Sequence, residues 1–446
     1  MSPLPTSTAP LAVAPTTAED TVPPRRLDFE VVIAGAGMVG STLATALGQA
    51  GIRVGLIEGR DLSQGVGADG RASALALGTA RILQRIGVWP LMEAWGVSPI
   101  HRIQVSDGES PWMAQLCRET LQAPALGYVV ENQITQKALL QRIRECPSVT
   151  LFSPAQVQSF SPAADHIRVE LAQEGSRQTL RAALLVIADG ARSRLREQAG
   201  IPLSRWGYGQ VCIVSTLTHE HPHRQVAYER FQASGPFAIL PTPDPHRSCV
   251  VWTVRQADRD WLMGLSEAEF LQAIRPWFGS QLGALLAASP RACYEPQRAH
   301  AQTYIGSRLA LVGDAAHTTH PLGGQGANLG MRDVAALAAL LIEAKMAGRD
   351  PGDPALLKAY ERCRRPENAL VLFATDAANR LFSNRSWPLL VLRRLGLWGL
   401  EVLPLLKPAL MRQAMGIRPH QPQLQQLPFP APPEPLATPV WIRPNC

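Results

Sequence analysis

The sequence lacks the cysteine pairing that a disulfide framework or a structural zinc site needs. Its seven cysteines are scattered along 446 residues, their number is odd, and none forms a Cys-x-x-Cys pair. Both kinds of site normally show regular cysteine spacing. We therefore expect free thiols in a reducing, cytoplasmic location and no metal site.

Long apolar runs and basic clusters are also missing. No uninterrupted apolar stretch reaches the length of a membrane span, and the arginines behind the formal net charge of +7 are dispersed. Nucleic acid is therefore not an expected partner. Anionic cofactors or an anionic membrane surface account for the positive charge at least as well.

The two ends of the chain contain little that would form a core. Residues 1–27 are rich in Pro, Thr, Ala and Ser, and residues 418–446 hold many prolines. The first segment has neither the basic start nor the long apolar centre of a signal peptide. We predict two disordered tails around a folded region that is large enough for two domains.

A glycine-rich turn follows the first apolar strand, predicted over 29–34. Gly35 permits a tight turn, Gly37 lets the backbone approach a pyrophosphate, and Gly40 lets a helix pack on the strand. Glu58 ends the next strand, where a carboxylate accepts hydrogen bonds from ribose hydroxyls. These features predict a βαβ unit that binds a dinucleotide.

A second glycine box lies far along the chain. Asp314 stands at the end of a strand over 309–312, where a carboxylate can hold a polyol hydroxyl such as those of a ribityl chain. A long helix follows, and its first N–H groups suit a ring that becomes negative on reduction. Two distant boxes indicate a long cofactor held at both ends, which favours FAD over NAD. The loop before this helix supplies the candidates His317, Pro321, Gly324, Gly326 and Asn328.

Several further motifs are ambiguous on their own. Asp189-Gly190 ends another apolar strand and is equally typical of a plain turn. Arg71, taken alone, reads as a solvated surface residue. His320, like His317, reads as a hydrogen-bonded loop histidine, and the histidine-rich segment 219–223 as a solvated turn rather than a metal motif.

Taken in order, the three boxes resemble the single-component FAD-dependent aromatic hydroxylases over roughly residues 29–415. Within that family, the closest likeness is to the ubiquinone-biosynthesis hydroxylase branch. The likeness rests on Val130-Glu131-Asn132, the string Gly313 to His317, the segment 321–330 and Asp333. It implies bound FAD, NAD(P)H as a transient reductant and O2 as co-substrate. It also implies hydroxyl transfer from a flavin hydroperoxide to a phenolic ring. We expect this ring to be that of a polyprenylated quinone precursor.

The resemblance assigns a role to most of the candidate residues. It places Gly35, Gly37 and Gly40 at the pyrophosphate, Glu58 at the adenosine ribose, Arg71 at FAD, Asp189 and Gly190 near pyrophosphate and NAD(P)H, Asp314 at the ribityl chain, and Pro321 with 323–328 over the flavin ring. Gln136 stands where many members have an arginine, so an ionic contact is lost. His317 and Pro321 are the candidates nearest the reaction, although oxygen transfer itself demands no catalytic base.

The order of elements predicts an α/β fold with a Rossmann-like FAD-binding domain, an inserted antiparallel-sheet substrate domain and a C-terminal helical region. We also expect helices over 75–96 and 266–288. The predicted domain boundaries are 28–103, 127–204 and 296–352 for the FAD-binding domain, 104–126 and 205–295 for the substrate domain, and 353–417 for the C-terminal helices.

Alternatives remain open at this point. One is a flavoprotein of the same fold with different chemistry, such as a prenyl-chain reductase or another aromatic monooxygenase. Another is a non-catalytic flavin-binding subunit of a biosynthetic assembly. The segment 386–415, rich in Leu, Trp and Pro with interleaved basic residues, is either a helical pair that covers the core or a peripheral membrane contact through which a lipophilic phenol enters. Assembly into a biosynthetic complex or a homo-oligomer is likewise open.

Overall fold

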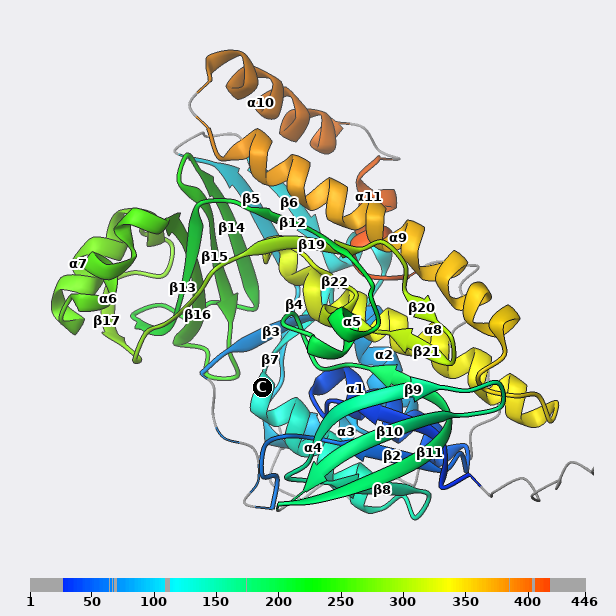
Figure 1. Cartoon of the computed structure of the whole chain (residues 1–446). Helices are drawn as coiled ribbons and strands as arrows, with labels where there is room; N and C mark the ends of the chain where they lie inside the picture. The colour runs from blue at the N-terminus through cyan, green and yellow to red at the C-terminus, as the bar shows by residue number, and fades with distance from the viewer. Residues whose placement is uncertain are drawn as a thin grey trace, which may run out of the picture.

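A computed structural model describes residues 27–417 apart from 64, 66, 68, 69, 109–112, 174, 385 and 403–405. The two predicted tails therefore lie outside the described residues, except for Leu27. Two eight-stranded sheets with separate apolar cores make up most of the described chain. Long helices lie against both sheets (Figure 1).

The first sheet has the strand order β20-β21-β11-β1-β2-β8, and neighbours from β21 to β8 run parallel. Its central strands are continuous apolar runs because helices cover the sheet. Two further strands, β9 and β10, extend β11 in antiparallel pairing. The bounds are β1 Phe29–Ala34, β2 Val54–Ile57, β8 Val149–Phe152, β9 Gln156–Pro162, β10 Ile167–Gln173, β11 Ser176–Ile187, β20 Ile305–Gly306 and β21 Leu309–Leu311.

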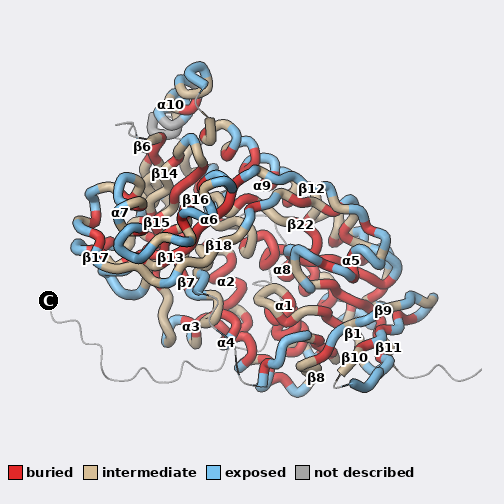
Figure 2. Tube along the Cα trace, turned by 60° about the vertical axis from the view of Figure 1, so that its left-hand side comes forward, coloured by how far each residue is buried: buried red, intermediate tan, exposed pale blue. Residues whose placement is uncertain are grey.

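Two helices that follow the glycine boxes pack against one another beside this sheet. They are α1 (Met38–Gln49) and α8 (Gln325–Met346), and nearly all of α1 and the central part of α8 are buried. Figure 2 shows both as buried segments in the interior of the molecule. The remaining helices of this region are α2 Leu77–Arg85, α3 Trp89–Trp95, α4 Asn132–Arg144 and α5 Arg194–Gln198.

The second sheet has the order β17-β13-β16-β15-β14-β5-β6, with β18 also paired to β13. Its neighbours are antiparallel except β14 and β5, which run parallel. The sheet is therefore antiparallel as expected except at this pair, which is parallel because β5 comes from a distant part of the chain and not through a hairpin. The bounds are β5 Arg102–Asp107, β6 Met113–Cys117, β13 Gln210–His219, β14 Val226–Gln232, β15 Gly235–Pro241, β16 Arg247–Arg255, β17 Leu285–Ala288 and β18 Ala292–Tyr294.

The two faces of the second sheet have different neighbours. Alternate residues such as Phe237 and Trp252 pack with Phe270 and Ile274 of α7, which form the core of the outer face. The opposite, inner face is turned toward the second glycine box, since Leu322 packs against the apolar cluster that contains Phe231 of β14. The outer helices are α6 Arg259–Gly264 and α7 Glu267–Phe278.

Two small sheets and three C-terminal helices complete the fold. The small sheets have the orders β3-β7-β4 and β12-β19-β22. Helix α9 is long and contacts both α8 and β15, so it spans the two large sheets. The bounds are β3 Ala72–Ala76, β4 Ser98–Ile100, β7 Gly127–Glu131, β12 Leu203–Gly207, β19 Gln297–Ala301, β22 His317–Thr318, α9 Pro354–Phe382, α10 Trp387–Val402 and α11 Leu406–Ala414.

Two predicted helices are shorter than expected because glycines interrupt them. The segment 75–96 begins in β3 and then divides into α2 and α3, with Gly87 between them at φ +70°. The segment 266–288 is helical only to Phe278, and Gly279 at φ +77° ends the helix before β17 begins. Left-handed glycines are common at helix ends, and the apolar pattern does not reveal them.

Candidate active site

The first glycine turn combines two crowded positions with one open position. A Cβ atom on Gly35 would lie 2.4 Å from the Ala188 carbonyl oxygen, and one on Gly40 would lie 1.9 Å from the Gly35 carbonyl oxygen. A Cβ atom on Gly37 would have no neighbour within 4 Å. Packing therefore requires glycine at the two crowded positions, whereas Gly37 leaves space beside the start of α1 for a ligand.

Two side chains hold this turn from neighbouring elements. At the end of β2, Glu58 accepts a hydrogen bond from the Ala36 N–H (2.9 Å), and its other oxygen accepts one from Arg60 Nε (2.9 Å). On α4, the buried Gln136 donates to the Ala36 carbonyl oxygen (2.9 Å). Gln136 thus contacts the turn through a neutral hydrogen bond, and Glu58 lies beside the phosphate-binding loop where a ribose carboxylate is expected.

The second glycine box packs directly on the first. A Cβ atom on Gly313, which has φ +60°, would lie 3.1 Å from the Val39 side chain, and one on Gly330 would lie 2.7 Å from it. Because Val39 belongs to the first box, the two boxes meet although most of the chain separates them. This contact is the close approach that a cofactor held at both ends requires.

Asp314 and Asp189 stand at strand ends, where solvent reaches each residue but the surrounding protein partly desolvates its carboxylate. Burial raises the pKa of Asp314, against the lowering effect of His317 and Arg71. Burial also raises the pKa of Asp189, opposed by hydrogen bonds from the Ser193 hydroxyl and the Leu195 N–H. A carboxylate that is accessible but poorly hydrated lies in a recess, where a ligand hydroxyl can replace the missing water.

Arg71 connects the second box with the second sheet. Burial raises the pKa of Tyr294 on β18, and the Arg71 guanidinium opposes that shift as it does for Asp314. Its charge therefore acts on residues of both sheets. The expectation of a plain surface arginine does not describe this position, and the role implied by the family resemblance fits it better.

The loop after Pro321 leads into α8 through two left-handed glycines. Gly323 and Gly324 have φ of +62° and +61°, and a Cβ atom on Gly324 would lie 2.9 Å from Ala74. No side chain caps α8 at Gly324, so the N–H groups of its first turn, including that of Gly326, have no partner within the helix. Such a helix start attracts an anionic group.

Asn328 differs from its expected role as a cofactor ligand. Its side-chain oxygen accepts from the Ala76 N–H (2.8 Å) and the Thr79 hydroxyl (2.7 Å), and its amide donates to the Ala74 and Gly324 carbonyls (2.9 and 2.8 Å). These bonds use both amide hydrogens and both lone-pair positions. The side chain therefore fixes β3 against the loop and leaves nothing for a flavin.

His317 also differs from its expected place beside the flavin. It is 1% exposed and its Nε2 donates to Asp333 Oδ2 (2.6 Å). The same carboxylate oxygen accepts from the Gly313 N–H (3.1 Å), while Oδ1 accepts from Arg364 Nε and Asn368 Nδ2 (both 2.9 Å). His317 thus belongs to a fully buried ionic cluster under the second box and presents almost no surface to a bound flavin.

This cluster, made of His317, Asp333, Arg364 and Asn368, was not predicted as a unit. Burial alone would raise the pKa of Asp333, but the charges of His317 and Arg364 outweigh it and hold the pKa at about 2. Arg364 and Asn368 lie on α9, in a stretch of sequence with no local motif. The one signal in the sequence is that Asp333 stands among apolar residues of a helix, where a carboxylate needs buried partners.

The other histidines of interest are buried as well, although His320 Nε2, like His317 Nδ1, has no hydrogen-bond partner among the described residues. Burial lowers the pKa of His320 to about 4, so the ring is neutral, and its Nδ1 accepts from the Leu322 N–H (3.3 Å). In the turn 219–223, His219 and His223 are buried and bonded to Ser248 and to backbone carbonyls. That segment is a turn as expected, but these two histidines are not solvated.

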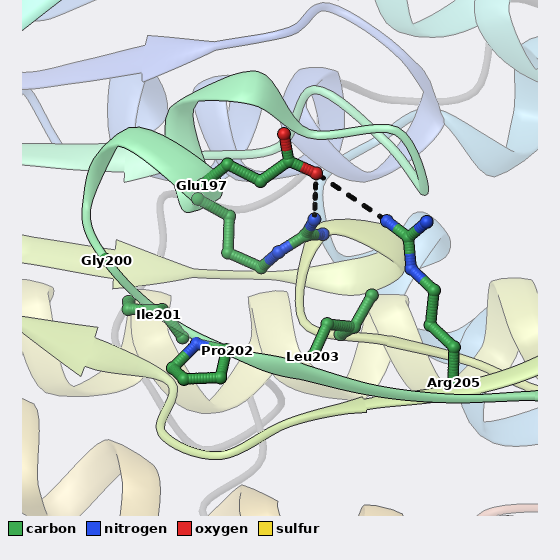
Figure 3. A pocket seen from close by; sticks show the side chains of 7 residues that line it. Glu197, Gly200, Ile201, Pro202, Leu203 and Arg205 are labelled. Carbon is green, nitrogen blue, oxygen red and sulfur yellow. Dashed lines mark hydrogen bonds and ion pairs between the residues drawn. The ribbon is translucent and has the colours of Figure 1, made fainter.

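A surface pocket of about 340 Å³ lies between α5 and β12 (Figure 3). Arg196 and Arg205 approach Glu197 there, at 3.2 and 3.7 Å, so the charges of its lining are paired. None of the glycine boxes lines this pocket. We therefore assign the candidate active site to the boxes and the inner face of the second sheet.

The residues present fit an FAD molecule. Gly37 and the uncapped start of α1 suit the pyrophosphate, Glu58 the adenosine ribose, Asp314 the ribityl hydroxyls, and the start of α8 the reducible ring. Asp189 with Gly190, and Arg71, border the same region. The expected cofactor residues thus lie together, with Asn328 and Gln136 supporting the loops.

Comparisons with known proteins agree with this assignment. Residues 28–374 match the family model described as FAD binding domain. The chain is 44% identical to the ubiquinone hydroxylase UbiL of Rhodospirillum rubrum, over 89% of this chain and 92% of that protein. It is 35% identical to the 3-demethoxyubiquinol 3-hydroxylase of Escherichia coli, over 87% and 98% of the two chains.

A solved structure shows the same fold. The p-nitrophenol 4-monooxygenase PnpA from Pseudomonas putida superposes with a TM-score of 0.73 at 20% sequence identity, covering 87% of this chain and 99% of that one. The predicted α/β class, with an FAD-binding domain, a second sheet and C-terminal helices, is confirmed. The predicted domain boundaries and the individual cofactor contacts stay predictions.

The open position of Gly37 gives a first test. We expect Gly37→Ala to fold normally but to bind FAD at least about tenfold more weakly, because the added methyl group occupies the space for the pyrophosphate. Fluorescence titration of the apoprotein with FAD measures this affinity. Gly207→Ala is the matched control, since a Cβ atom there also meets nothing within 4 Å. Equal FAD affinity in the two variants would contradict the assignment.

The buried cluster gives a second test. Asp333→Asn should lower the free energy of unfolding at pH 7 by about 3–5 kcal/mol, because it removes the buried anion that accepts from His317 and Arg364, and of its ion pairs Arg364 then keeps the one with Glu367. The folded pKa of Asp333 lies below the unfolded value of about 3.9, so the wild-type advantage is complete above that pH and is lost toward about pH 2.

Denaturant unfolding at pH 7 measures this loss, and Asp258→Asn is the control. Asp258 forms an exposed pair with Arg255 (3.0 Å), so its change should cost at most about 1 kcal/mol. Similar losses in both variants would show that the Asp333 cluster has no special role in stability.

Proposed function

The chain belongs to the FAD-binding flavoprotein family, in the branch of the ubiquinone-biosynthesis hydroxylases, and on that premise we propose that it hydroxylates the phenolic ring of a polyprenylated quinone precursor. The observation that supports this most directly is the position of the loop after Pro321. Through Leu322 it packs against the apolar cluster that contains Ala114 and Phe231, on the inner face of the second sheet. A ring bound on that face would therefore lie beside the reducible end of FAD.

Bound FAD supplies the oxygen-activating chemistry, with NAD(P)H as reductant. The residues of the chain bind and orient the reactants. The start of α8 stabilises negative charge at the loop. Largely apolar residues of the second sheet keep water away from the reacting ring. The overall reaction converts the phenol, O2, NAD(P)H and a proton into the hydroxylated ring, NAD(P)+ and water.

Product-coupled oxygen consumption tests the proposed reaction. With FAD-loaded protein, NAD(P)H and 2-geranylphenol, we expect NAD(P)H oxidation to produce close to one hydroxylated ring per O2 consumed. Mass spectrometry of the product together with an oxygen electrode measures this ratio. NAD(P)H oxidation without ring hydroxylation, or saturation of the geranyl chain, would favour the open alternatives, a reductase or a non-catalytic flavin-binding subunit.

We further propose that α10 contacts a membrane surface from which a lipophilic phenol is taken up. Trp387, Val391, Leu395 and Trp398 are 40–73% exposed, and their spacing places them on one side of the helix. On α10, Arg393 is buried and donates to Asp107 of β5 (2.8 Å). The exposed apolar side is therefore carried by a helix that is bonded to β5 and packs on β6, the edge strand of the second sheet. In Figure 1 this helix lies at the outer end of the molecule.

No helix among the described residues is long and apolar enough to cross a membrane. The proposed peripheral contact uses the exposed side of α10, together with basic residues such as Arg394.

Liposome flotation tests this contact. Replacing Trp387, Val391, Leu395 and Trp398 together by Gln should reduce flotation with phosphatidylglycerol-containing vesicles at least about fivefold, because the apolar anchor is lost. A control variant replaces the exposed Trp206 and Trp261, which lie elsewhere, and should float like the wild type. Equal flotation of all three proteins, or none from the wild type, would rule out the α10 contact.

A further inference from the structure

Glu229 on β14 is an ionisable residue within an apolar row on the inner face of the second sheet. Its register partners are Val105 on β5 and Ala238 on β15. The row continues through Val251 on β16 and Val214 on β13. The side chains of Glu229, Ala238 and Val251 are all partly accessible to solvent, so this row borders open space and not a closed core.

The carboxylate of Glu229 has no partner among the described residues. No hydrogen bond or ion pair reaches it there, and burial alone raises its pKa to about 8. Its neighbours along the same face of β14 are Ala227 and Phe231, which belong to apolar clusters. An unpaired carboxylate in such surroundings costs free energy, so a purely structural role would not maintain it there.

Glu229 lies on the side of the sheet that faces the loop after Pro321. Val105, its partner on β5, packs against the apolar cluster of Ala114, Phe231 and Phe382, and Leu322 of the loop after Pro321 packs against the same cluster. Burial raises the pKa of the Cys212 thiol to about 11, and the Glu229 carboxylate adds to that shift, so the two groups are close. Cys212 pairs in register with Tyr294, whose hydroxyl feels the charge of Arg71.

The other titratable groups on this side of the sheet do not neutralise Glu229. They are the Cys249 thiol, which is bonded to the Ala72 backbone and whose pKa burial raises to about 12, and Asp107, which is paired with Arg393. Neither offers a proton donor or a free cation to the carboxylate. A ligand that donates a hydrogen bond would satisfy it.

We propose that Glu229 binds the phenolic hydroxyl of the substrate and accepts its proton during hydroxylation, an inference that rests on the proposed function. The residue is suited to an uncharged phenol, because an O–H group donates to the carboxylate. A ring that carries its own carboxylate would be repelled in this poorly hydrated place. Glu229 thus acts both as a base and as a determinant of specificity.

During hydroxylation the phenol proton moves to Glu229 and back. The phenol O–H bond breaks, its electron pair stays on oxygen, and the proton moves to the Glu229 carboxylate. The ring, enriched in electrons, forms the new C–O bond at its ortho or para carbon with one atom of O2, and NAD(P)H supplies the electrons that reduce the other atom to water. The C–H bond at that carbon then breaks, its electron pair restores the aromaticity of the ring, and its proton joins the oxygen atom that leaves as water. Glu229 returns its proton to the phenol oxygen.

Steady-state kinetics with 2-geranylphenol test this role. In the wild type, kcat/KM should rise with pH through about 8, as Glu229 loses its proton. Glu229→Gln should lower kcat/KM by about 10²–10⁴-fold and remove this rise, whereas Glu229→Asp should retain the rise at a lower rate. Tyr228→Phe, on the opposite face of the same strand, is the matched control and should behave like the wild type.

FAD content and the thermal midpoint of each variant establish that it is folded. A Glu229→Gln variant with wild-type kcat/KM and pH profile would overturn the role of Glu229 while leaving the proposed function intact. A wild-type protein that holds FAD but hydroxylates no phenol would instead overturn the proposed function, and this inference with it.

A second measurement needs no variant. The wild type should hydroxylate 2-geranylphenol with a kcat/KM at least about tenfold higher than 3-geranyl-4-hydroxybenzoate, which differs only by the added carboxylate. Equal use of the two compounds would overturn the inference even if Glu229→Gln failed to fold.

Discussion

The buried carboxylate of Asp333 is the interaction on which the arrangement of the site depends. It accepts hydrogen bonds from the Gly313 N–H, His317, Arg364 and Asn368, and so joins the second glycine box and α9 to α8. A carboxylate removed from water is stable only while such partners remain in place. The second box, with Asp314 at its exposed edge, therefore has one position relative to both helices.

Helix α9 extends this constraint to the second sheet. Near its end, Phe382 stacks on Phe231 of β14 with ring centroids 3.9 Å apart. Arg393 of α10 donates to Asp107 of β5 and to the Phe382 carbonyl oxygen. One continuous set of contacts thus connects the cofactor loop, the inner face with Glu229 and the exposed side of α10. A lipophilic substrate that approaches along α10 would meet the sheet at the edge nearest this face.

Local signals in the sequence predicted the cofactor, but they did not identify the buried cluster around Asp333 or the residues proposed to contact the substrate. The strand at 29–34 was placed correctly because a continuous apolar run ends there at a glycine turn. Arg364 and Asn368 escaped prediction because their partner Asp333 lies about thirty residues away on another helix. Glu229, between Tyr228 and Arg230, looks like a residue of a solvated strand face, and only the tertiary fold encloses it. The prediction that Asn328 binds the cofactor has the same cause, because the sequence does not reveal its four hydrogen bonds to other parts of the protein.

The central claim is that the reacting ring lies between the loop after Pro321 and the inner face of the second sheet. A crystal structure of the protein with FAD and 2-geranylphenol tests it most directly. We expect the reducible end of FAD against the start of α8, with the phenol oxygen within hydrogen-bonding distance of Glu229. A phenol bound away from this sheet, or an FAD ring turned away from α8, would contradict it.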